Sequence, residues 1–327
     1  MTPPERTAMN KNVVVIGGGH GQSAICRGIK NIEGLHITAI VTVADDGGST
    51  GRLRRKFHIP AMGDIRAVMI ALSESETLMS ELMNYRFADP DGTEEDIGGH
   101  NLGNLILTAL TQETGSFLEA IQTVGQVLRV KGQIVPATTQ VITLLARMED
   151  GVIVRGEANI PDRNHHISEV FYEEQVHADP DAVQAIREAD LIIYGVGSLY
   201  TSILPNIIIP EIRDALRESK AERVYLCNAM TQPGETDGFS VEDHVQALKQ
   251  HGTPVDAVVV PADASPDEIL QRYYAESSTP VTVTEMDHDY EIIRLPLLSF
   301  ENQLIRHDSV RIKEAVEYLL HLQEDDD

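Results

Sequence analysis

Tryptophan is absent from this sequence, and aromatic residues make up only 5% of its 327 positions. Cysteine is scarce as well. Cys26 and Cys227 lie in different segments, so we expect two buried thiols rather than a disulfide or a cysteine-only metal site. No run of about eighteen apolar residues occurs, which argues against a membrane-spanning helix. The first ten residues lack the apolar stretch of a secretory signal, so we expect a cytoplasmic protein.

Basic residues are few. The sequence has 26 lysines and arginines and 51 aspartates and glutamates, which gives a formal net charge of −25. Such a chain repels nucleic acids and anionic membrane surfaces, so neither is expected as a partner. An anionic ligand must therefore be met by local backbone amides and by individual arginines. The basic run RLRRKF at 52–57 stands out, although a basic helix face would also explain it.

Apolar runs rich in β-branched residues alternate with helical patterns along the chain. We predict strands at 13–17, 36–43, 191–196, 224–228 and 257–260 and in PVTVTE at 280–285. We predict helices over 65–86, 101–129 with a break near Thr114-Gly115, 181–190, 207–219, 241–251, 267–275 and 308–322. This alternation indicates an α/β fold with a Rossmann-like, doubly wound and mostly parallel sheet.

Shorter β-like runs between 133 and 160 interrupt this alternation. They indicate a small inserted antiparallel β segment or an extension of the sheet edge. We therefore expect a disordered leader at 1–11, one α/β domain over 12–322 with an insertion at about 130–165, and an acidic tail at 323–327.

Glycines gather where the first predicted strand ends, in Gly17-Gly18-Gly19-His20-Gly21. Glycine lets the backbone approach a ligand closely, and the amides that open the following helix bind phosphate. The spacing is not the dinucleotide fingerprint, because Gln22 stands where the third glycine belongs, and no P-loop lysine follows. A tight turn without a ligand would need the same glycines. We predict a phosphate-bearing, nucleotide-type ligand here.

The second predicted strand ends in a polar loop that should lie beside the glycines. Its Asp45 and Asp46 could hold ribose hydroxyls or a divalent cation such as magnesium. Ser49, Thr50 and Arg52 could bind phosphate. A solvated Asp-Gly turn would explain the same sequence.

Two further loops could complete the walls of the site. Asp64 is either a second acidic wall or an ordinary helix N-cap. His100, Asn101 and Asn104 open a long apolar helix, either as its cap or as a binding loop.

A second glycine-hydroxyl loop follows the predicted strand at 191–196 and suits another anion, although a plain strand-helix turn would look alike. Its candidate contacts are Gly197, Ser198, Tyr200, Thr201 and Ser202. Asn228 and Thr231 follow the next strand and could read a base or a sugar. The sequence offers no G-x-S-x-G elbow and no base beside Cys26, so the catalytic residues, if any, stay unknown.

Together the motifs IGGGHG, DDGGSTGRLRR, MGDIR, GHNLGNL, GSLYTSI and MTQPGET resemble the gluconeogenesis factor family (YvcK-type). That family belongs to the superfamily of 2-phospho-L-lactate transferase (CofD-type). The resemblance covers about residues 12–320. It implies a Rossmann-like fold, a cytoplasmic location and binding of a nucleotide sugar such as UDP-N-acetylglucosamine. It also implies a role in cell shape and peptidoglycan wall metabolism during gluconeogenic growth.

The resemblance places the ligand among the residues named above and adds Tyr274 and Arg306 as contacts. The adjacent Tyr273 could align with the same family position as Tyr274. Two positions depart from the family pattern. His20 stands where many relatives carry threonine, and Val196 stands where proline is common. Neither change removes a charge, so we expect an altered fit and not lost binding. Homo-oligomers and regulatory protein partners are expected only by analogy.

Three functions are compatible with these residues. The first is a regulatory protein that senses a UDP-sugar. The second is a transferase resembling 2-phospho-L-lactate transferase, which would use a GDP-type donor and magnesium held by the aspartates. The third is a nicotinamide-dependent oxidoreductase, which the missing third glycine disfavours. The sequence favours the first, because it offers no evident nucleophile and few aromatics to line a flavin cavity.

Overall fold

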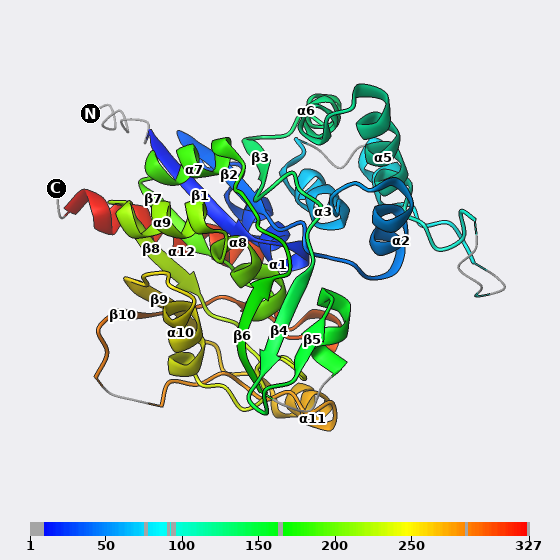
Figure 1. Ribbon diagram of the computed structural model, residues 1–327. Coiled ribbons are helices and arrows are strands. Elements are labelled where there is room, and N and C mark those ends of the chain that lie inside the picture. Colours follow the sequence, from blue (N-terminus) through cyan, green and yellow to red (C-terminus); the bar gives the residue numbers. More distant parts are fainter. Residues whose placement is uncertain are drawn as a thin grey trace, which may run out of the picture.

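The computed structural model describes residues 10–74, 78–89, 92, 96–162, 166–284 and 287–325. A seven-stranded parallel sheet forms its centre, in the order β10-β9-β8-β7-β1-β2-β3 (Figure 1). These strands are β1 (Lys11–Gly17), β2 (Leu35–Val41), β3 (Gln133–Pro136), β7 (Leu191–Tyr194), β8 (Glu222–Leu226), β9 (Ala257–Pro261) and β10 (Glu291–Leu295). The direction of winding reverses between β1 and β7, so the sheet is doubly wound and the predicted Rossmann-like fold is confirmed.

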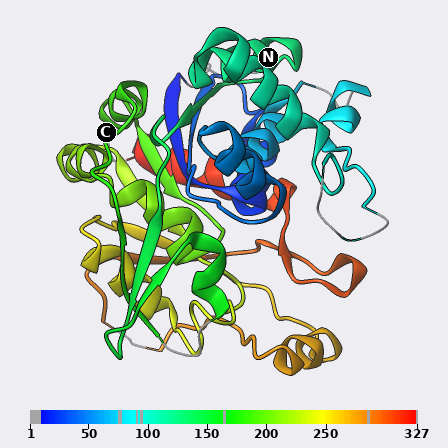
Figure 2. The same ribbon diagram turned by 45° about the vertical axis from the view of Figure 1, so that its right-hand side comes forward.

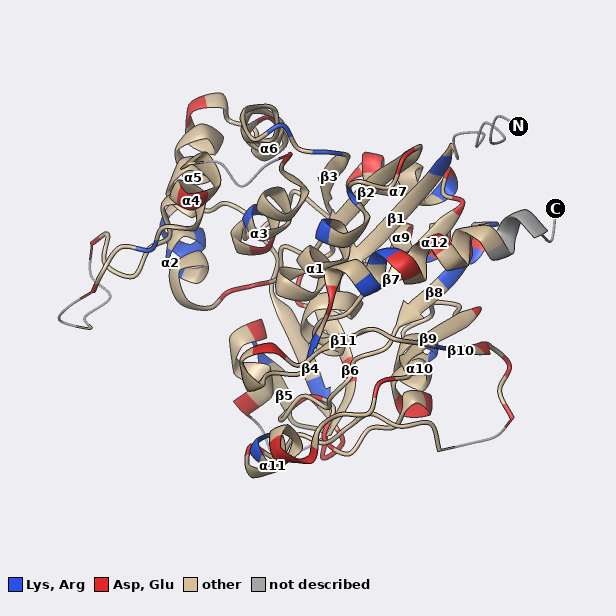
Figure 3. Cartoon of the chain, turned by 180° about the vertical axis from the view of Figure 1, so that it is seen from behind, with Lys and Arg blue, Asp and Glu red and all other residues tan. Residues whose placement is uncertain are grey.

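Helices cover both faces of this sheet. Figure 3 shows α1, α3 and α12 on one face, and Figure 1 shows α7, α8 and α9 on the other. The helices are α1 (Gly19–Ile29), α2 (Gly48–Phe57), α3 (Gly63–Leu72), α4 (Leu78–Asn84), α5 (Leu102–Thr114), α6 (Phe117–Val127), α7 (Pro180–Arg187), α8 (Leu204–Ile207), α9 (Pro210–Glu218), α10 (Val241–Gln250), α11 (Asp267–Ala275) and α12 (Ser309–Asp325). Shorter turns are η1 (Glu157–Asp162), the π-helical η2 (Leu199–Ile203) and η3 (Glu301–Gln303).

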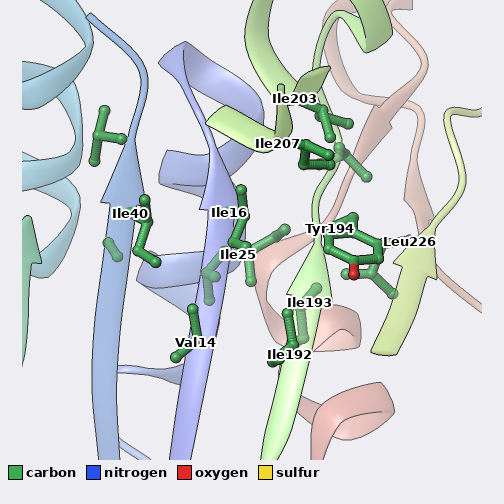
Figure 4. Packing of buried hydrophobic residues seen from close by; sticks show 14 of the residues in the cluster. Val14, Ile16, Ile25, Ile40, Ile192, Ile193, Tyr194, Ile203, Ile207 and Leu226 are labelled. Carbon is green, nitrogen blue, oxygen red and sulfur yellow. The ribbon is translucent and has the colours of Figure 1, made fainter. Parts of the chain in front are cut away.

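The burial of the core explains why the sequences of the central strands are continuous apolar runs. Because helices cover both faces, side chains on either side of β1 and β7 are buried. Figure 4 shows Ile16 of β1, Ile25 of α1 and Tyr194 of β7 in this packing. Cys26 and Cys227 are buried free thiols, and burial raises the pKa of each to about 12, as expected of inert side chains.

A separate three-stranded antiparallel sheet has the order β5-β4-β6, formed by β4 (Leu144–Met148), β5 (Ile153–Arg155) and β6 (Ile167–Tyr172). The inserted antiparallel segment therefore spans 144–172, while the QIVP run becomes β3 at the edge of the main sheet. The β11 (Leu298–Ser299) and β12 (Arg306–His307) hairpin, in orange-red, and α11, in gold, lie at the lower right of Figure 2.

Several predicted boundaries differ from the structure. Residues 280–284 of the predicted PVTVTE strand form no strand, whereas the unpredicted EIIRL run pairs with β9 as β10. The predicted helix over 65–86 is two helices, α3 and α4; Ser73, which follows α3, is not helical and bridges to Val130. Strand β1 already begins at Lys11, and α12 continues to Asp325. The rest of the predicted leader, at 1–9, lies outside the described residues.

No helix among the described residues is both long enough and apolar enough to cross a membrane.

Candidate functional site

The glycine turn, defined as residues 17–21, lies where the winding of the sheet reverses. The loops after β1 and β7 touch at this point. A Cβ added to Gly17 would lie 3.3 Å from the carbonyl oxygen of Gly195, and one added to Gly21 would lie 1.4 Å from that of Val196. No side chain fits at Gly21. The glycines are therefore required by the close approach of two backbones, at the position where doubly wound sheets bind ligands.

Helix α1 starts inside the glycine turn. Gly19 opens it with a φ of +58°, and Gly18 precedes it without any side-chain cap. The first-turn amides of a helix have no intrahelical acceptor, so they offer N–H groups and a partial positive charge to an anion. The start of α1 therefore carries glycines and first-turn amides of the kind that bind phosphate elsewhere, while phosphate binding at this turn stays a prediction.

Gln22 shows why the third fingerprint glycine is missing. Its side chain is fully buried, and its Nε2 donates to the carbonyl oxygens of Val15 at 2.8 Å and Ile40 at 2.9 Å. The amide therefore ties α1 to both β1 and β2. A glycine at this position would remove that link.

One side of the glycine turn already faces an anion. The Gly19 N–H donates to the carboxylate of Asp64, and a Cβ on Gly18 would lie 2.4 Å from Asp64 Oδ2. Burial, followed by the charge of Asp45, raises the pKa of Asp64 to about 7. Helix α3 begins at Gly63, so Asp64 lies in its first turn and the interpretation as an N-cap is wrong.

The two aspartates after β2 have different partners. Asp45 Oδ1 accepts from the Gly47 N–H at 2.9 Å, and burial raises the pKa of Asp45. Asp46 Oδ1 instead accepts from the Ala158 N–H at 3.0 Å, which joins this loop to η1. Beside them lies Glu157, which sequence reasoning missed. Burial, and then repulsion from Asp45 and other carboxylates, raises the pKa of Glu157 to about 8.

The second glycine-hydroxyl loop is held by Glu235, which belongs to the MTQPGET motif at 230–236 but was not among the contacts predicted from it. Its Oε1 accepts from Thr201 Oγ1 at 3.0 Å, while Ser198 Oγ donates to Gln232. Glu235 is 1% exposed, its Oε2 has no partner among the described residues, and burial raises its pKa to about 7. We call Asp45, Asp64, Glu157 and Glu235 the carboxyl cluster.

Two other members of that loop take structural positions. Tyr200 is buried, and its hydroxyl donates to the carbonyl of Ile167, so its side chain is committed to the small sheet. Ser202 is half-buried, and its backbone N–H donates to the Ser198 carbonyl.

The loop that opens α5 bonds mainly to α2 and to itself. Ser49 Oγ lies 2.8 Å from His100 Nδ1, and Asn101 caps α5 by accepting from the Gly103 and Asn104 amides. Arg52 donates to the Gly98 carbonyl at 2.7 Å.

Arg54, which is buried, and Arg66, which is half-buried, form further hydrogen bonds near α2 and α5. Asn104 Oδ1 accepts from Arg66 Nε at 3.1 Å. Arg54, unnoticed in the sequence, is the buried arginine of the basic run and donates to the carbonyls of Ala44, Asp45 and Ile142. The structure brings the predicted residues of this region together, but many of their polar groups hold one another.

A cavity of about 490 Å³ opens on the other side of the glycine turn. His20, Gly21, Val196 and Gly197 line it near the turn, and Asn228 Nδ2 donates to the Gly197 carbonyl at 2.8 Å. No aspartate or glutamate lines this cavity, whereas four other cavities in the described chain each include at least one. We call it the carboxylate-free cavity.

Some of the candidate contacts from the C-terminal third of the chain line this cavity, and others do not. Arg306 and Tyr273 line it, and Tyr273 holds the β11–β12 hairpin by accepting from the Ile305 N–H at 2.9 Å. Tyr274 is 45% exposed and is not among its lining residues. Thr231 is buried and accepts from the Thr279 N–H at 2.8 Å. Of the two adjacent tyrosines, only Tyr273 is among the residues that line this cavity, and a ligand contact by either one stays a prediction.

The predicted metal site at Asp45 and Asp46 has few protein ligands. In the described residues no group of three or more His, Cys, Asp or Glu side chains could hold a metal ion. Asp46 is engaged by η1, while Asp45 and Asp64 interact electrostatically. Carboxylate oxygens are the donors that magnesium prefers, usually with phosphate oxygens and waters completing its shell. A magnesium ion here would therefore take most of its ligands from water molecules or from a bound phosphate.

Comparison with known proteins agrees with this architecture. The profile of the family described as 2-phospho-L-lactate transferase CofD matches residues 13–298. The gluconeogenesis factor of Bacillus subtilis is 45% identical over 314 residues, covering 94% of this chain and 98% of that protein. A putative gluconeogenesis factor of Thermotoga maritima is 42% identical, covering 93% and 98%. The chain belongs to the gluconeogenesis factor family, within the CofD family. The resemblance noted in the sequence is confirmed.

A solved relative supports the same assignment. The crystal structure of a UPF0052 family member from Bacillus halodurans superposes with a TM-score of 0.88 at 42% identity. The match covers 94% of this chain and 99% of that one. The doubly wound sheet is therefore shared with this relative.

Proposed function

We propose that this gluconeogenesis factor family member is a cytoplasmic regulatory protein that binds a nucleotide sugar of the UDP-N-acetylglucosamine type. In this proposal the bound state signals the supply of wall precursors and supports cell shape and peptidoglycan metabolism during gluconeogenic growth. The names of the relatives from Bacillus subtilis and Thermotoga maritima support the gluconeogenic part. The ligand is argued from the chemistry of the cavity.

The observation that carries the proposal is the carboxylate-free cavity against the first turn of α1. In a chain of net charge −25, this cavity has no acidic lining residue and contains Arg27 and Arg306. Neither arginine side chain has a hydrogen bond or ion pair to the described residues. Unpaired guanidinium groups beside free helix amides suit a diphosphate, which accepts hydrogen bonds from both.

The remaining lining of the cavity supports binding rather than catalysis. Burial lowers the pKa of His307 to about 4, and its Nε2 lies 3.1 Å from the Cys227 carbonyl, so this imidazole is neutral and engaged. Asn228 is oriented by the Gly197 carbonyl and by the Tyr225 hydroxyl. The cavity offers hydrogen-bonding groups for a sugar or base, without an activated nucleophile.

A second candidate, a 2-phospho-L-lactate transferase-like enzyme, is favoured by the carboxyl cluster and by the description of the matching family. Asp45 and Asp64 would hold magnesium together with donor phosphate oxygens. That ion would supply positive charge to neutralise a transferring phosphate. The protein residues would hold the aspartates in place through the Gly47 and Gly19 amides.

Thermal denaturation with a fluorescent dye separates the two candidates. A ligand that binds only the folded chain raises the melting temperature. We expect UDP-N-acetylglucosamine to do so without magnesium, and GDP with magnesium to leave it unchanged. Stabilisation by GDP with magnesium alone would contradict the regulatory proposal and favour the transferase.

A further inference from the structure

Two loops that follow the neighbouring strands β7 and β8 form one wall of the carboxylate-free cavity. The loop after β7 contributes Val196 and Gly197, and the loop after β8 contributes Asn228, Ala229 and Met230. A hydrogen bond joins them at the cavity, from Asn228 Nδ2 to the Gly197 carbonyl oxygen at 2.8 Å. The shape of this wall therefore depends on what else holds the two loops together.

Glu235 joins the same two loops from outside the cavity. Its Oε1 accepts from Thr201 Oγ1, which follows β7, at 3.0 Å and from Gln232 Nε2, in its own loop, at 2.7 Å. Gln232 Oε1 in turn accepts from Ser198 Oγ at 2.6 Å. Ser198 directly follows Gly197, so this network fixes the chain beside a residue that lines the cavity. Glu235 is 1% exposed and is not itself a lining residue.

The Glu235 carboxylate lies where the sequence predicted an external anion. The second glycine-hydroxyl loop was expected to bind phosphate through groups that include Thr201, but the Thr201 hydroxyl donates to Glu235. Burial raises the pKa of Glu235 to about 7, and the backbone amides of Tyr200 and Thr201, which face the carboxylate, counteract part of this rise. A ligand phosphate cannot use these donors while Glu235 occupies them.

We infer that Glu235 is a positioning residue, a built-in anion that holds the loop after β7 against the loop after β8 and so sets the shape of the carboxylate-free cavity. This inference rests on the proposed function, because nucleotide-sugar affinity is one of its measures. It implies that the ligand phosphates bind at the glycine turn and not at the second loop. It also implies that Thr201 affects the ligand through Glu235 and not by direct contact.

Chemical rescue with a small carboxylate tests this role. Glu235→Ala removes the internal anion and leaves room for formate. By calorimetry we expect this variant to bind UDP-N-acetylglucosamine about tenfold more weakly than the wild type, the effect of one charge-assisted hydrogen bond. Sodium formate should restore most of the lost affinity, whereas sodium chloride at the same ionic strength should not. A purely stabilising side chain would not show this rescue.

Asp237→Ala is the control variant. Asp237 lies two residues further along the same loop, and its Oδ2 accepts from the Gly234 N–H at 2.7 Å within that loop. Its removal takes away the same charge, so affinity should stay close to that of the wild type and should not respond to formate. Glu235→Gln should retain part of the affinity, because its carbonyl oxygen can still accept from Thr201 and Gln232.

Thr201→Val distinguishes positioning from direct contact, since valine keeps the shape of threonine and lacks the donor. If Thr201 acts through Glu235, the double variant should bind no more weakly than Glu235→Ala alone. Additive losses would show that Thr201 contacts the ligand and would overturn the inference. Wild-type affinity in Glu235→Ala, or no rescue by formate, would overturn it as well.

A measurement without nucleotide sugar separates this inference from the proposed function. Formate that enters the vacated position should raise the melting temperature of Glu235→Ala more than that of the wild type. If this selective stabilisation occurs and UDP-N-acetylglucosamine does not bind the wild type, the proposed function fails while Glu235 remains the internal anion. If neither occurs, both are wrong.

Discussion

The glycine turn separates two regions of opposite chemistry. On its Gly18–Gly19 side lies Asp64, a member of the carboxyl cluster, whose carboxylate accepts the first amide of α1. On its His20–Gly21 side lies the carboxylate-free cavity with its two unpaired arginines. One short loop therefore has a buried acidic side and an open side without carboxylates.

This contrast shows that net charge does not decide where an anion binds. The global charge of −25 repels a nucleotide sugar, yet the local lining of one cavity is cationic. The buried carboxyls on the other side have pKa values raised to between about 7 and about 8 for Asp64, Glu157 and Glu235. Near neutral pH they compete for protons or a cation and would repel a second phosphate.

The largest effect on stability is expected from adding a side chain at Gly21, which lies between the two regions. Gly21→Ala places a Cβ 1.4 Å from the Val196 carbonyl oxygen, so α1 must move away from the loop after β7. We expect the free energy of unfolding to fall by about 3 kcal/mol or more. Urea denaturation measures it.

Gly125→Ala is the matched control, because Gly125 lies inside α6 and its added Cβ would meet only ordinary contacts at 3.9 Å and beyond. Alanine should stabilise that helix by up to about 1 kcal/mol. Equal effects at the two glycines would show that the close approach of the loops is not required.

A pH-dependent effect tests the carboxyl cluster. The pKa of Glu157 is about 8 in the folded chain against an ordinary 4.5, so folding takes up a proton between these values. The free energy of unfolding should therefore decrease as pH rises from about 4.5 to 8 and then level off. Glu157→Gln removes this dependence, so it should stabilise the protein by roughly 1–3 kcal/mol at pH 9 and have little effect at pH 5.

Glu173→Gln is the opposite case, at a carboxylate that directly follows β6. Its hydrogen bond to Arg155 lowers the pKa of Glu173, so neutralising it should give no gain in stability at pH 9. Stabilisation of both variants to the same extent would indicate a general effect of net charge and contradict a local cluster.

A smaller effect distinguishes the two adjacent tyrosines. Tyr273→Phe removes the hydroxyl that accepts from Ile305 and so loosens the hairpin carrying Arg306. We expect a two- to fivefold loss of nucleotide-sugar affinity, about the value of one neutral hydrogen bond. Tyr274→Phe should leave affinity unchanged. The reverse order in calorimetry would restore Tyr274 to the site.

The sequence predicted the main sheet and the glycine turn because both depend on local patterns. Runs such as VVVIG are buried strands, and glycines between a strand and a helix mark a close backbone approach. It missed β10, whose EIIRL run carries Glu291 and Arg294 at the edge of the sheet, and so lacks the continuous apolar pattern of central strands.

The site was predicted less completely, because several contributors come from distant segments. Glu157 and Glu235 enter through η1 and the loop after β8, and neither sits in a motif that singles out a carboxylate. Arg27 follows the glycine turn by two helical turns, a relation visible as i, i+4, i+7 spacing from His20. Tyr200 was predicted as a contact but turns toward Ile167, an orientation that sequence spacing does not reveal.

The most direct test of the central claim is calorimetric titration of UDP-N-acetylglucosamine, without magnesium, into Arg306→Ala and Asp64→Asn. Arg306 lines the carboxylate-free cavity, whereas Asp64 belongs to the carboxyl cluster. We expect at least about tenfold weaker binding for Arg306→Ala, since a charged hydrogen bond is lost, and a change of less than about threefold for Asp64→Asn. Strong weakening by Asp64→Asn with no effect of Arg306→Ala would place the ligand on the acidic side and contradict it.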